Sequence, residues 1–492
     1  MEAVILWDVI TMIIRSSRFI AMTTLLIVAA TVMAQTGRTG SSAWGAQVDK
    51  VFAEWNRPDS PGCALALFQD GKIIYELGYG MADLEHNVPI TPETVFYVRS
   101  LSKQFTAMAA ALAIQQGRLS HDDDIRKYLP ELPSYGPVVT VRHLIHHTSG
   151  LRDVNTLLTM AGRRGDEAFN NLEVLRLVAR QKALNFNPGE QYLYSNSGYA
   201  FLALAVERAT GTPFGKYAEA NIFKPLGMTV THFHDDLSRI VKHRAYAYER
   251  RPSGEIRLDT PYNERSGAGG VMTNVRELLK WDENFFDGHV GGKSLIEQLQ
   301  VPGRLNSGQA LNYAWGLQVT TYRGLRLVEH GGSLGGYRAH LMRFPERHFS
   351  IACLCNLGSI NPGALSRQVA DIYLADHFTE PKPTTAAIGG SNAQRPPRET
   401  PLPPLSVKQL ADYAGTYYSD ELEATFVVLV QGGRLAVRRG LQREATPLEP
   451  DSTDQFRLAG MTVRFNRDAN GRINGMSVQA GRVQNIRFVK QP

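Results

Sequence analysis

The chain has 492 residues, of which 43% are hydrophobic and 20% are charged, and its formal net charge at pH 7 is +6. This composition is typical of an ordinary globular protein with room for two or three domains, and it excludes an intrinsically disordered chain. No basic cluster is interleaved with aromatic residues as in a nucleic-acid groove. We therefore attribute the positive charge to a solvated surface and expect no nucleic-acid partner.

The N-terminal segment has the pattern of an export signal. Arg15 and Arg18 precede an apolar run over 19–30, and the small residues that a signal peptidase requires end at Ala34. This pattern predicts a signal peptide over 1–34 and a periplasmic or secreted protein. The rival interpretation is an uncleaved signal, which is the only route to a membrane that we expect.

A β-hairpin is predicted over 63–77, because two apolar runs flank the turn Asp70-Gly71. The chain has three cysteines, Cys63, Cys353 and Cys355. We favour buried free thiols that act as small hydrophobic side chains. The alternative is a disulfide between Cys63 and one of the later pair, which an oxidising compartment would permit. Neither spacing suggests a metal site, and we expect no cofactor.

The segment 96–107 places a hydroxyl and an amine three residues apart. Ser100 and Lys103 lie at the start of a predicted helix that ends near Gly117. Residues one helical turn apart share a face, so the amine can reach the hydroxyl and activate it as a nucleophile. A Ser-x-x-Lys pattern alone has low specificity, so its weight depends on the rest of the chain.

Helical patterns dominate residues 120–290. Within them, Tyr194 and Asn196 stand between a Pro-Gly turn and an apolar helical run, where their side chains are free to face a cleft. His143, His146 and His147 have helical spacing, but no acidic or cysteine ligand is near them. We therefore expect a structural role for these histidines and no metal site.

Strands return over 313–322, 325–329, 337–344 and 349–354. His330 and Gly332 follow the second of them, where glycine lets a substrate approach the strand edge closely. Strands from both ends of the segment with helices between them predict an α+β fold. We expect an antiparallel sheet flanked by helices, with a cleft between the sheet and a helical lobe.

In this order, the three segments resemble the Ser-x-x-Lys, Tyr-x-Asn and Lys/His-x-Gly motifs of the penicillin-recognising serine hydrolases. The tyrosine of the second motif is similar to that of class C β-lactamases, D,D-carboxypeptidases, D-aminopeptidases and family VIII esterases. The resemblance covers roughly residues 45–380, and the ordered triplet is far more specific than any single motif. It implies the β-lactamase/transpeptidase-like fold and hydrolysis of an ester or amide.

The resemblance also implies roles for individual residues. Ser100 would be the acylated nucleophile, and Lys103 and Tyr194 would share the proton transfers. A tyrosine close to ammonium groups is expected to have its phenolate favoured. Asn196 would bind the substrate amide or orient Lys103. The backbone N–H groups of Ser100 and Ser333 would form the oxyanion hole.

The third motif departs from the class C pattern, because His330 stands where those enzymes have lysine. Histidine is only partly charged near pH 7, so it would anchor a substrate carboxylate more weakly. We expect His330, Gly332 and Ser333 to contact substrate. If His330 binds a carboxylate, kcat/KM for such a substrate should fall between about pH 5 and 8.

A linker and a second domain follow the hydrolase-like region. Residues 380–405 are rich in Pro, Thr, Ser and Gly, and 406–492 contain short alternating segments. We expect a domain over 35–379, a linker over 380–405 and a small antiparallel β barrel or sandwich over 406–492, similar to appended lipocalin-like domains. Its arginines are interpreted as a solvated outer face, and we assign this domain no chemistry.

Two alternatives to the favoured function remain open. The segment 331–335 also matches Gly-x-Ser-x-Gly, which would make Ser333 an α/β-hydrolase nucleophile with Asp371 or Asp376 and His377. That motif requires a helix after the serine, whereas a strand is predicted here. The other alternative is a β-lactam- or peptidoglycan-binding protein with little turnover. The favoured function is an exported serine hydrolase acting on a small ester, amide, D-amino-acid peptide or β-lactam, including peptidoglycan-derived peptides.

Overall fold

The computed structural model describes residues 43–163, 169–261, 265–382, 405–440 and 442–492. The predicted signal peptide over 1–34 and most of the predicted linker lie outside the described residues. None of the described helices combines the length and the apolar character that a membrane span requires.

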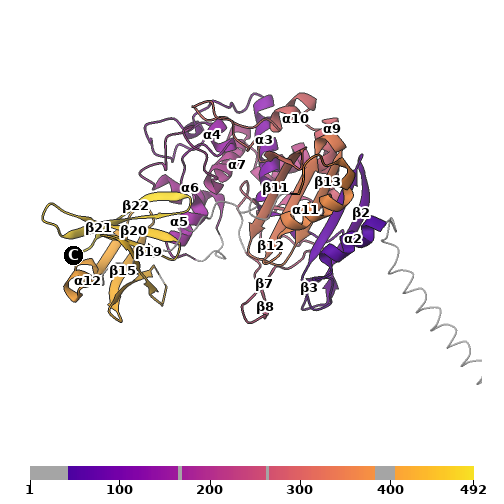
Figure 1. Cartoon of the computed structure of the whole chain (residues 1–492). Helices are drawn as coiled ribbons and strands as arrows, with labels where there is room; N and C mark the ends of the chain where they lie inside the picture. Colours follow the sequence, from indigo (N-terminus) through magenta and orange to yellow (C-terminus); the bar gives the residue numbers. More distant parts are fainter. Residues whose placement is uncertain (1–42, 164–168, 262–264, 383–404, 441) are drawn as a thin grey trace, which may run out of the picture.

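A six-stranded antiparallel sheet forms the centre of the larger part of the molecule (Figure 1). It joins strands from both ends of this part, which confirms the predicted sheet. In spatial order the strands are β10 (Gln318–Tyr322), β11 (Leu325–Leu334), β12 (Tyr337–Phe344), β13 (Phe349–Cys355), β1 (Cys63–Gln69) and β2 (Lys72–Tyr79).

Helices cover both faces of this sheet. Successive side chains of a strand point to opposite faces, so Leu65 and Leu67 of β1 belong to one core and Ala64 and Ala66 to the other. The first face packs against α2 (Ala43–Phe52) and α11 (Pro362–Tyr373), and the second against α9 (Val275–Asp287). Because both faces are covered, β1 and β13 read as continuous apolar runs rather than as alternating strands.

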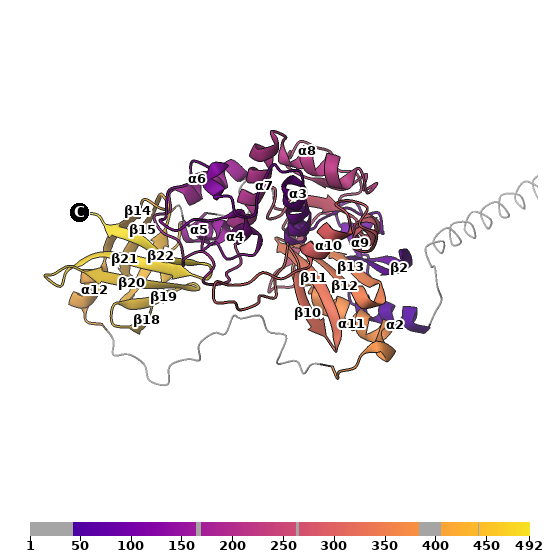
Figure 2. The same cartoon turned by 90° about the horizontal axis from the view of Figure 1, so that it is seen from above.

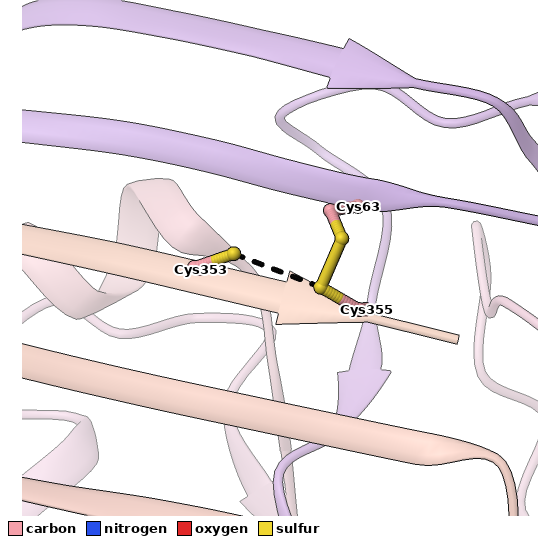
Figure 3. A group of neighbouring side chains, drawn as sticks. All are labelled: Cys63, Cys353 and Cys355. Carbon is pink, nitrogen blue, oxygen red and sulfur yellow. Dashed lines mark hydrogen bonds between the residues drawn. A yellow bond between two sulfur atoms is a disulfide. The ribbon is translucent and has the colours of Figure 1, made fainter. Parts of the chain in front are cut away.

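Cys63 and Cys355 lie opposite each other in the register of β1 and β13 and form a disulfide (Figure 3). Cys353, two residues earlier on the same face, is a buried free thiol whose sulfur lies 3.6 Å from that of Cys355. The favoured prediction of three free thiols is therefore wrong, and the alternative disulfide is correct.

The second layer is a helical lobe beside the sheet (Figures 1 and 2). Its central helix α3 begins at the predicted motif, and all of its residues from Lys103 to Ala113, five of which are alanine, are buried. The lobe contains α3 (Lys103–Gln115), α4 (Val141–Ile145), α5 (Val154–Met160), α6 (Asn171–Ala179), α7 (Asn196–Thr210), α8 (Phe214–Ala218) and α10 (Lys293–Leu299).

Short helices and strands lie between the larger elements. The short helices are η1 (Arg99–Ser102), η2 (Ile125–Lys127), η3 (Glu219–Phe223), η4 (Pro345–Arg347) and η5 (Ala375–His377). The short strands are β3 (Met81–Asp83), β4 (Val88–Pro89), β5 (Phe96–Tyr97), β6 (His232–Phe233), β7 (Tyr248–Arg250), β8 (Ile256–Leu258) and β9 (Val271–Thr273). β5 pairs with β9 and leads directly into η1, which fixes the start of α3 against the sheet.

The C-terminal part is a nine-stranded antiparallel sheet that curls into a barrel-like shape around apolar side chains, which are continuous with the core of the helical lobe. The predicted small β domain is therefore confirmed as a fold. It consists of α12 (Val407–Tyr413) and the strands β14 (Gly415–Ser419), β15 (Ala424–Gln431), β16 (Arg434–Arg439), β17 (Thr446–Pro447), β18 (Glu449–Ser452), β19 (Gln455–Leu458), β20 (Met461–Arg467), β21 (Ile473–Ala480) and β22 (Val483–Lys490). We call it the C-terminal β domain.

The C-terminal β domain lies against the helical lobe beside α5 and α6 (Figures 1 and 2). Arg152, just before α5, forms an ion pair with Glu421 of the β domain, and both side chains are buried. Glu421 also accepts a hydrogen bond from the Lys182 backbone N–H at 3.0 Å. A buried charge pair with additional hydrogen bonds fixes the register of two surfaces, so the two parts meet in one defined arrangement.

Candidate active site

Ser100 and Lys103 lie at the junction of η1 and α3, and Ser100 lines a cavity between the lobe and the sheet. The Lys103 side chain is fully buried, and its Nζ lies 3.3 Å from Ser100 Oγ. The same Nζ donates to Asn196 Oδ1 at 3.0 Å and to the Ala268 carbonyl at 2.7 Å. The amine is thus held by two acceptors while it faces the serine hydroxyl.

Asn196 is the first residue of α7, whose N-cap is Ser195. Its side-chain amide is oriented by Asp153, because Asn196 Nδ2 donates to Asp153 Oδ2 at 2.9 Å and leaves Oδ1 for Lys103. Asp153 is fully buried and also accepts from the Asn196 backbone N–H at 2.7 Å. The sequence reasoning missed Asp153, although its position after the Ser-Gly turn at 149–150 as the N-cap of α5 was a usable signal.

Burial lowers the pKa of Lys103 well below that of a free lysine, and the nearby Arg482 and Arg265 charges act in the same direction. Asp153 opposes this shift. A neutral amine has two N–H donors and one lone pair. The two donors match the carbonyl groups of Asn196 and Ala268, so the lone pair is left for the Ser100 hydroxyl. This geometry suits a general base.

Tyr194 lies just before α7 and completes the group. Its ring lies 4.7 Å from Lys103 Nζ, and its hydroxyl is hydrogen-bonded to Ser100. Burial raises the pKa of Tyr194, and the bond to Ser100 only partly opposes that shift. The expectation of a favoured phenolate is therefore wrong, because burial in apolar surroundings penalises the charged form more than nearby cations stabilise it.

The His147 ring packs against the Tyr194 ring. The two ring centroids are 4.2 Å apart, and His147 Nδ1 accepts from the Ser195 backbone N–H at 3.1 Å. Burial lowers the pKa of His147 well below its usual value, so the ring is neutral. These contacts agree with the predicted structural role.

His330 is buried, with only 6% of its surface exposed, whereas the resemblance implied contact with the substrate. Its Nδ1 donates to the Gly331 carbonyl at 2.6 Å, and its Nε2 therefore accepts from the Tyr313 hydroxyl at 3.1 Å. Burial, together with the charge of Lys103, lowers the pKa of His330 to about 3. The expectation that this ring changes charge between about pH 5 and 8 is wrong.

The outer half of β11 borders Ser100. β10 pairs only with Leu325–Glu329, so among the described strands the continuation of β11 has no partner on that side. A Cβ at Gly332 would lie 2.0 Å from the Val98 carbonyl oxygen, so only glycine allows β11 to approach η1 this closely. Ser333 follows, is exposed, and lines the same cavity as Ser100. Ser333 therefore lies on the same side of the cavity wall as the expectation of an oxyanion donor requires, beside Ser100.

The α/β-hydrolase alternative does not fit this arrangement. Ser333 lies in β11 beside the turn to β12, and no helix follows it. Asp371 accepts from the Tyr322 hydroxyl at 3.0 Å, at the other end of β11. Asp376 and His377 lie in η5, and His377 borders a surface hollow beside the β12–β13 turn. A strand of eight residues spans about 25 Å, so these groups do not reach Ser333 and the alternative is wrong.

Two groups of side chains could hold a metal ion within the described ranges. One is the cluster of Cys63, Cys353 and Cys355, in which Cys63 and Cys355 form a disulfide and therefore offer no thiolate ligand. The other is Asp83, Glu85 and His86. Neither includes a residue of the Ser100 site or any of the histidines at 143–147.

An antiparallel sheet beside a helical lobe, with a serine–lysine pair at the start of the central helix, defines the class of penicillin-recognising proteins. Comparison with known sequences agrees: the Beta-lactamase family matches residues 48–375. The chain belongs to this family.

Several relatives resemble the chain. A D-aminopeptidase of Gluconobacter oxydans (strain 621H) is 28% identical over 296 residues, which are 60% of this chain and 56% of the relative. Penicillin-binding protein 4* of Bacillus subtilis (strain 168) is 30% identical over 302 residues, 58% of this chain and 66% of the relative. The chain thus spans between about half and two thirds of the length of these curated relatives.

Solved structures show the same fold. The octameric penicillin-binding protein homologue from Pyrococcus abyssi superposes with a TM-score of 0.59 at 24% identity, covering 91% of this chain and 99% of that one. The D-amino acid amidase from Ochrobactrum anthropi SV3 gives a TM-score of 0.57 at 22% identity, covering 68% of this chain and 99% of the amidase. The first match extends over most of the chain, which includes the C-terminal β domain.

Proposed function

We propose that the protein is a serine hydrolase that cleaves an ester or amide through an acyl-enzyme on Ser100. The observation that carries the proposal is the buried Lys103 amine. Two carbonyl acceptors hold its N–H groups, which leaves its lone pair directed toward Ser100 Oγ. Its lowered pKa makes the neutral, basic form more accessible than in a free lysine. The two relatives reported above include a D-aminopeptidase, so D-amino-acid amides and peptides are the first substrates to test.

In the proposed reaction, Lys103 accepts the proton of Ser100 as Oγ attacks the substrate carbonyl carbon. The carbonyl oxygen becomes an oxyanion, which the backbone N–H groups of Ser100 and Ser333 stabilise. The neutral phenol of Tyr194 donates its proton to the departing amine or alkoxide and recovers one from Lys103. Water then attacks the acyl-enzyme through the same groups in reverse, which releases the acid and restores Ser100.

The assignment of the first base to Lys103 follows from opposite effects of burial on the two candidates. Burial disfavours charge, so it makes the amine neutral and basic but keeps the phenol protonated. A protonated phenol is a donor, which suits Tyr194 to the leaving group rather than to the nucleophile. The two titrations are coupled through Ser100.

Mass spectrometry of the intact protein tests the proposal. Incubation with an activated ester, a D-alanyl peptide or a penicillin should add one acyl group, which peptide mapping places on Ser100. Ser100→Ala should abolish the adduct and Ser333→Ala should retain it. Turnover of the ester beyond one equivalent distinguishes a hydrolase from a binding protein, which would stop after a stoichiometric burst.

We also propose that the protein is exported. The support is the signal-like pattern ending at Ala34 together with the Cys63–Cys355 disulfide, which an oxidising compartment maintains. Mass determination of the protein recovered from its native cell should give an N-terminus at residue 35. Recovery of the unprocessed chain from the cytoplasm would contradict this.

A further inference from the structure

Three arginines face the cavity that contains Ser100. This cavity has a volume of about 140 Å³, and Arg99, Arg265 and Arg482 line it together with Ser100 and Tyr194. Among the described residues, no Asp or Glu lines it. Several guanidinium groups around one small cavity, with no acidic side chain in its wall, create a strongly positive site.

Arg99 is the most unusual of the three. Its side chain is 3% exposed, and its guanidinium stacks 3.9 Å from the centre of the Tyr97 ring. Its Nε and Nη2 have no hydrogen-bond partner among the described residues. Burial lowers the pKa of Arg99 to about 10. Buried donors without acceptors are costly, and an anion in the cavity would supply the missing acceptor.

Arg265 lies close enough to Arg99 for the two charges to repel each other, which contributes to the lowered pKa of Arg99. Its Nη1 donates to Asn155 Oδ1 at 2.6 Å, so a neutral amide rather than a carboxylate positions it. Asp153 also acts on the charge of Arg265, but one carboxylate does not balance three guanidinium groups, so the cavity favours a ligand that brings negative charge.

Arg482 comes from the C-terminal β domain. It occupies the turn between β21 and β22, and its carbonyl accepts from Asn185 Nδ2 at 3.0 Å, which fixes the turn against the lobe. Its guanidinium lies 5.5 Å from the centre of the Tyr194 ring. Asp153 Oδ2 is 3.5 Å from Arg482 Nη1. The same oxygen accepts hydrogen bonds from the backbone N–H and the side-chain Nδ2 of Asn196, so Arg482 shares this carboxylate with Asn196.

We propose that Arg99, Arg265 and Arg482 form an anion-binding subsite, which selects substrates that carry a carboxylate beside the bond cleaved at Ser100. This inference rests on the proposed function and specifies its substrate class. It also gives the C-terminal β domain a direct part in substrate binding, where the sequence had suggested only a solvated outer face. His330 is neutral and turned into the protein, so the carboxylate recognition that the resemblance placed at the third motif falls to these arginines.

Binding measurements test the subsite independently of catalysis. Isothermal titration calorimetry with the full-length Ser100→Ala protein should show that N-acetyl-D-alanine binds about ten-fold or more tightly than its neutral amide, N-acetyl-D-alaninamide. Arg99→Gln and Arg265→Gln, each added to Ser100→Ala, should remove this preference. Arg482→Gln should reduce it.

A matched control comes from β22, the strand that follows the turn containing Arg482. Arg487 is exposed on β22 and does not line the cavity, so Arg487→Gln should leave the preference unchanged. Circular dichroism and thermal unfolding establish that each variant is folded. Arg482→Gln also keeps the proposal testable if a buried arginine variant fails to fold, because this side chain is partly exposed and its turn is held by backbone contacts.

The outcomes separate the two proposals. Equal affinity for the acid and the amide, undetectable binding of both, or a preference that survives in all three arginine variants would overturn the anion-binding subsite. Failure of every activated ester to acylate Ser100 in the wild-type protein would overturn the proposed function, whatever the calorimetry shows. A preference for the acid that the arginine variants remove supports the subsite in either case.

Discussion

Replacing Gly332 by alanine should impair acylation of Ser100 without unfolding the protein. The new Cβ would lie 2.0 Å from the Val98 carbonyl oxygen and 3.2 Å from Arg99 Cβ. The first of these contacts is backbone and cannot rotate away. Ordinary contact begins near 3.4 Å, so β11 and η1 must move apart by about 1.4 Å.

This displacement sets the expected magnitude. The N–H of Ser333 and the Oγ of Ser100 lie on the two elements that separate, and a misplacement of about 1 Å costs about 100-fold in rate. Overpacking costs about 1–3 kcal/mol of unfolding free energy, which a protein of ordinary stability survives. We therefore expect about 100-fold slower acylation and a modest fall in thermal stability.

Gly331 provides the matched control. It precedes Gly332 on the same strand, but a Cβ there would meet its nearest atom, the Ala339 carbonyl oxygen, at 3.5 Å, which is ordinary contact. Gly331→Ala should acylate within about three-fold of the wild-type rate. Stopped-flow measurement of the burst with an activated ester gives both rates. If folded Gly332→Ala acylates at the wild-type rate, close contact between β11 and η1 is not needed, and the oxyanion assignment fails.

Three further predictions concern charge. Lys103→Arg should slow acylation by at least about 100-fold, because a guanidinium stays protonated and cannot accept the serine proton. In the wild-type protein, the acylation rate should fall as the pH drops through the lowered pKa of Lys103. A pH–rate profile that is the same in the wild type and in Lys103→Arg would contradict the role of Lys103 as base. Glu421→Gln should lower the unfolding free energy by about 3–5 kcal/mol, because Arg152 is left buried without its charged partner. Asp420→Asn is the control: Asp420 forms an exposed ion pair, so this variant should change the unfolding free energy by less than about 1 kcal/mol. Denaturant titration measures both values. His330 should add no inflection to the kcat/KM profile between about pH 5 and 8, since its pKa is about 3; an inflection lost in His330→Gln would show that the ring is charged in that range.

Sequence reasoning worked best where the information is local. Ser100 and Lys103 are three residues apart, so helix geometry alone places them together, and Tyr194 and Asn196 were recognised from a turn followed by a helical run. The strands of the central sheet were found from their apolar periodicity. The ordered motifs also gave the family, which the match over residues 48–375 confirms.

Electrostatic predictions failed where burial decides the outcome. The sequence shows that Tyr194 and His330 are near cations, but it does not show that both rings are enclosed by other aromatic side chains. Desolvation then reverses the expected direction for Tyr194 and removes the charge of His330 over the neutral range. The cysteines failed for a related reason, because the strand register that joins Cys63 to Cys355 is a tertiary property.

The amino-acid sequence by itself determined the nucleophile motif, the α+β character and the presence of a second β domain, because these depend on periodicity and on spacing within a few residues. Only the tertiary structure places Asp153 in hydrogen-bond contact with Asn196. It also places the β21–β22 turn of the C-terminal β domain at the cavity that contains Ser100. Arg482 donates to the carbonyl of Tyr194, 288 residues earlier in the chain. Contacts of that separation come from the packing of the C-terminal β domain against the helical lobe, which no local pattern encodes.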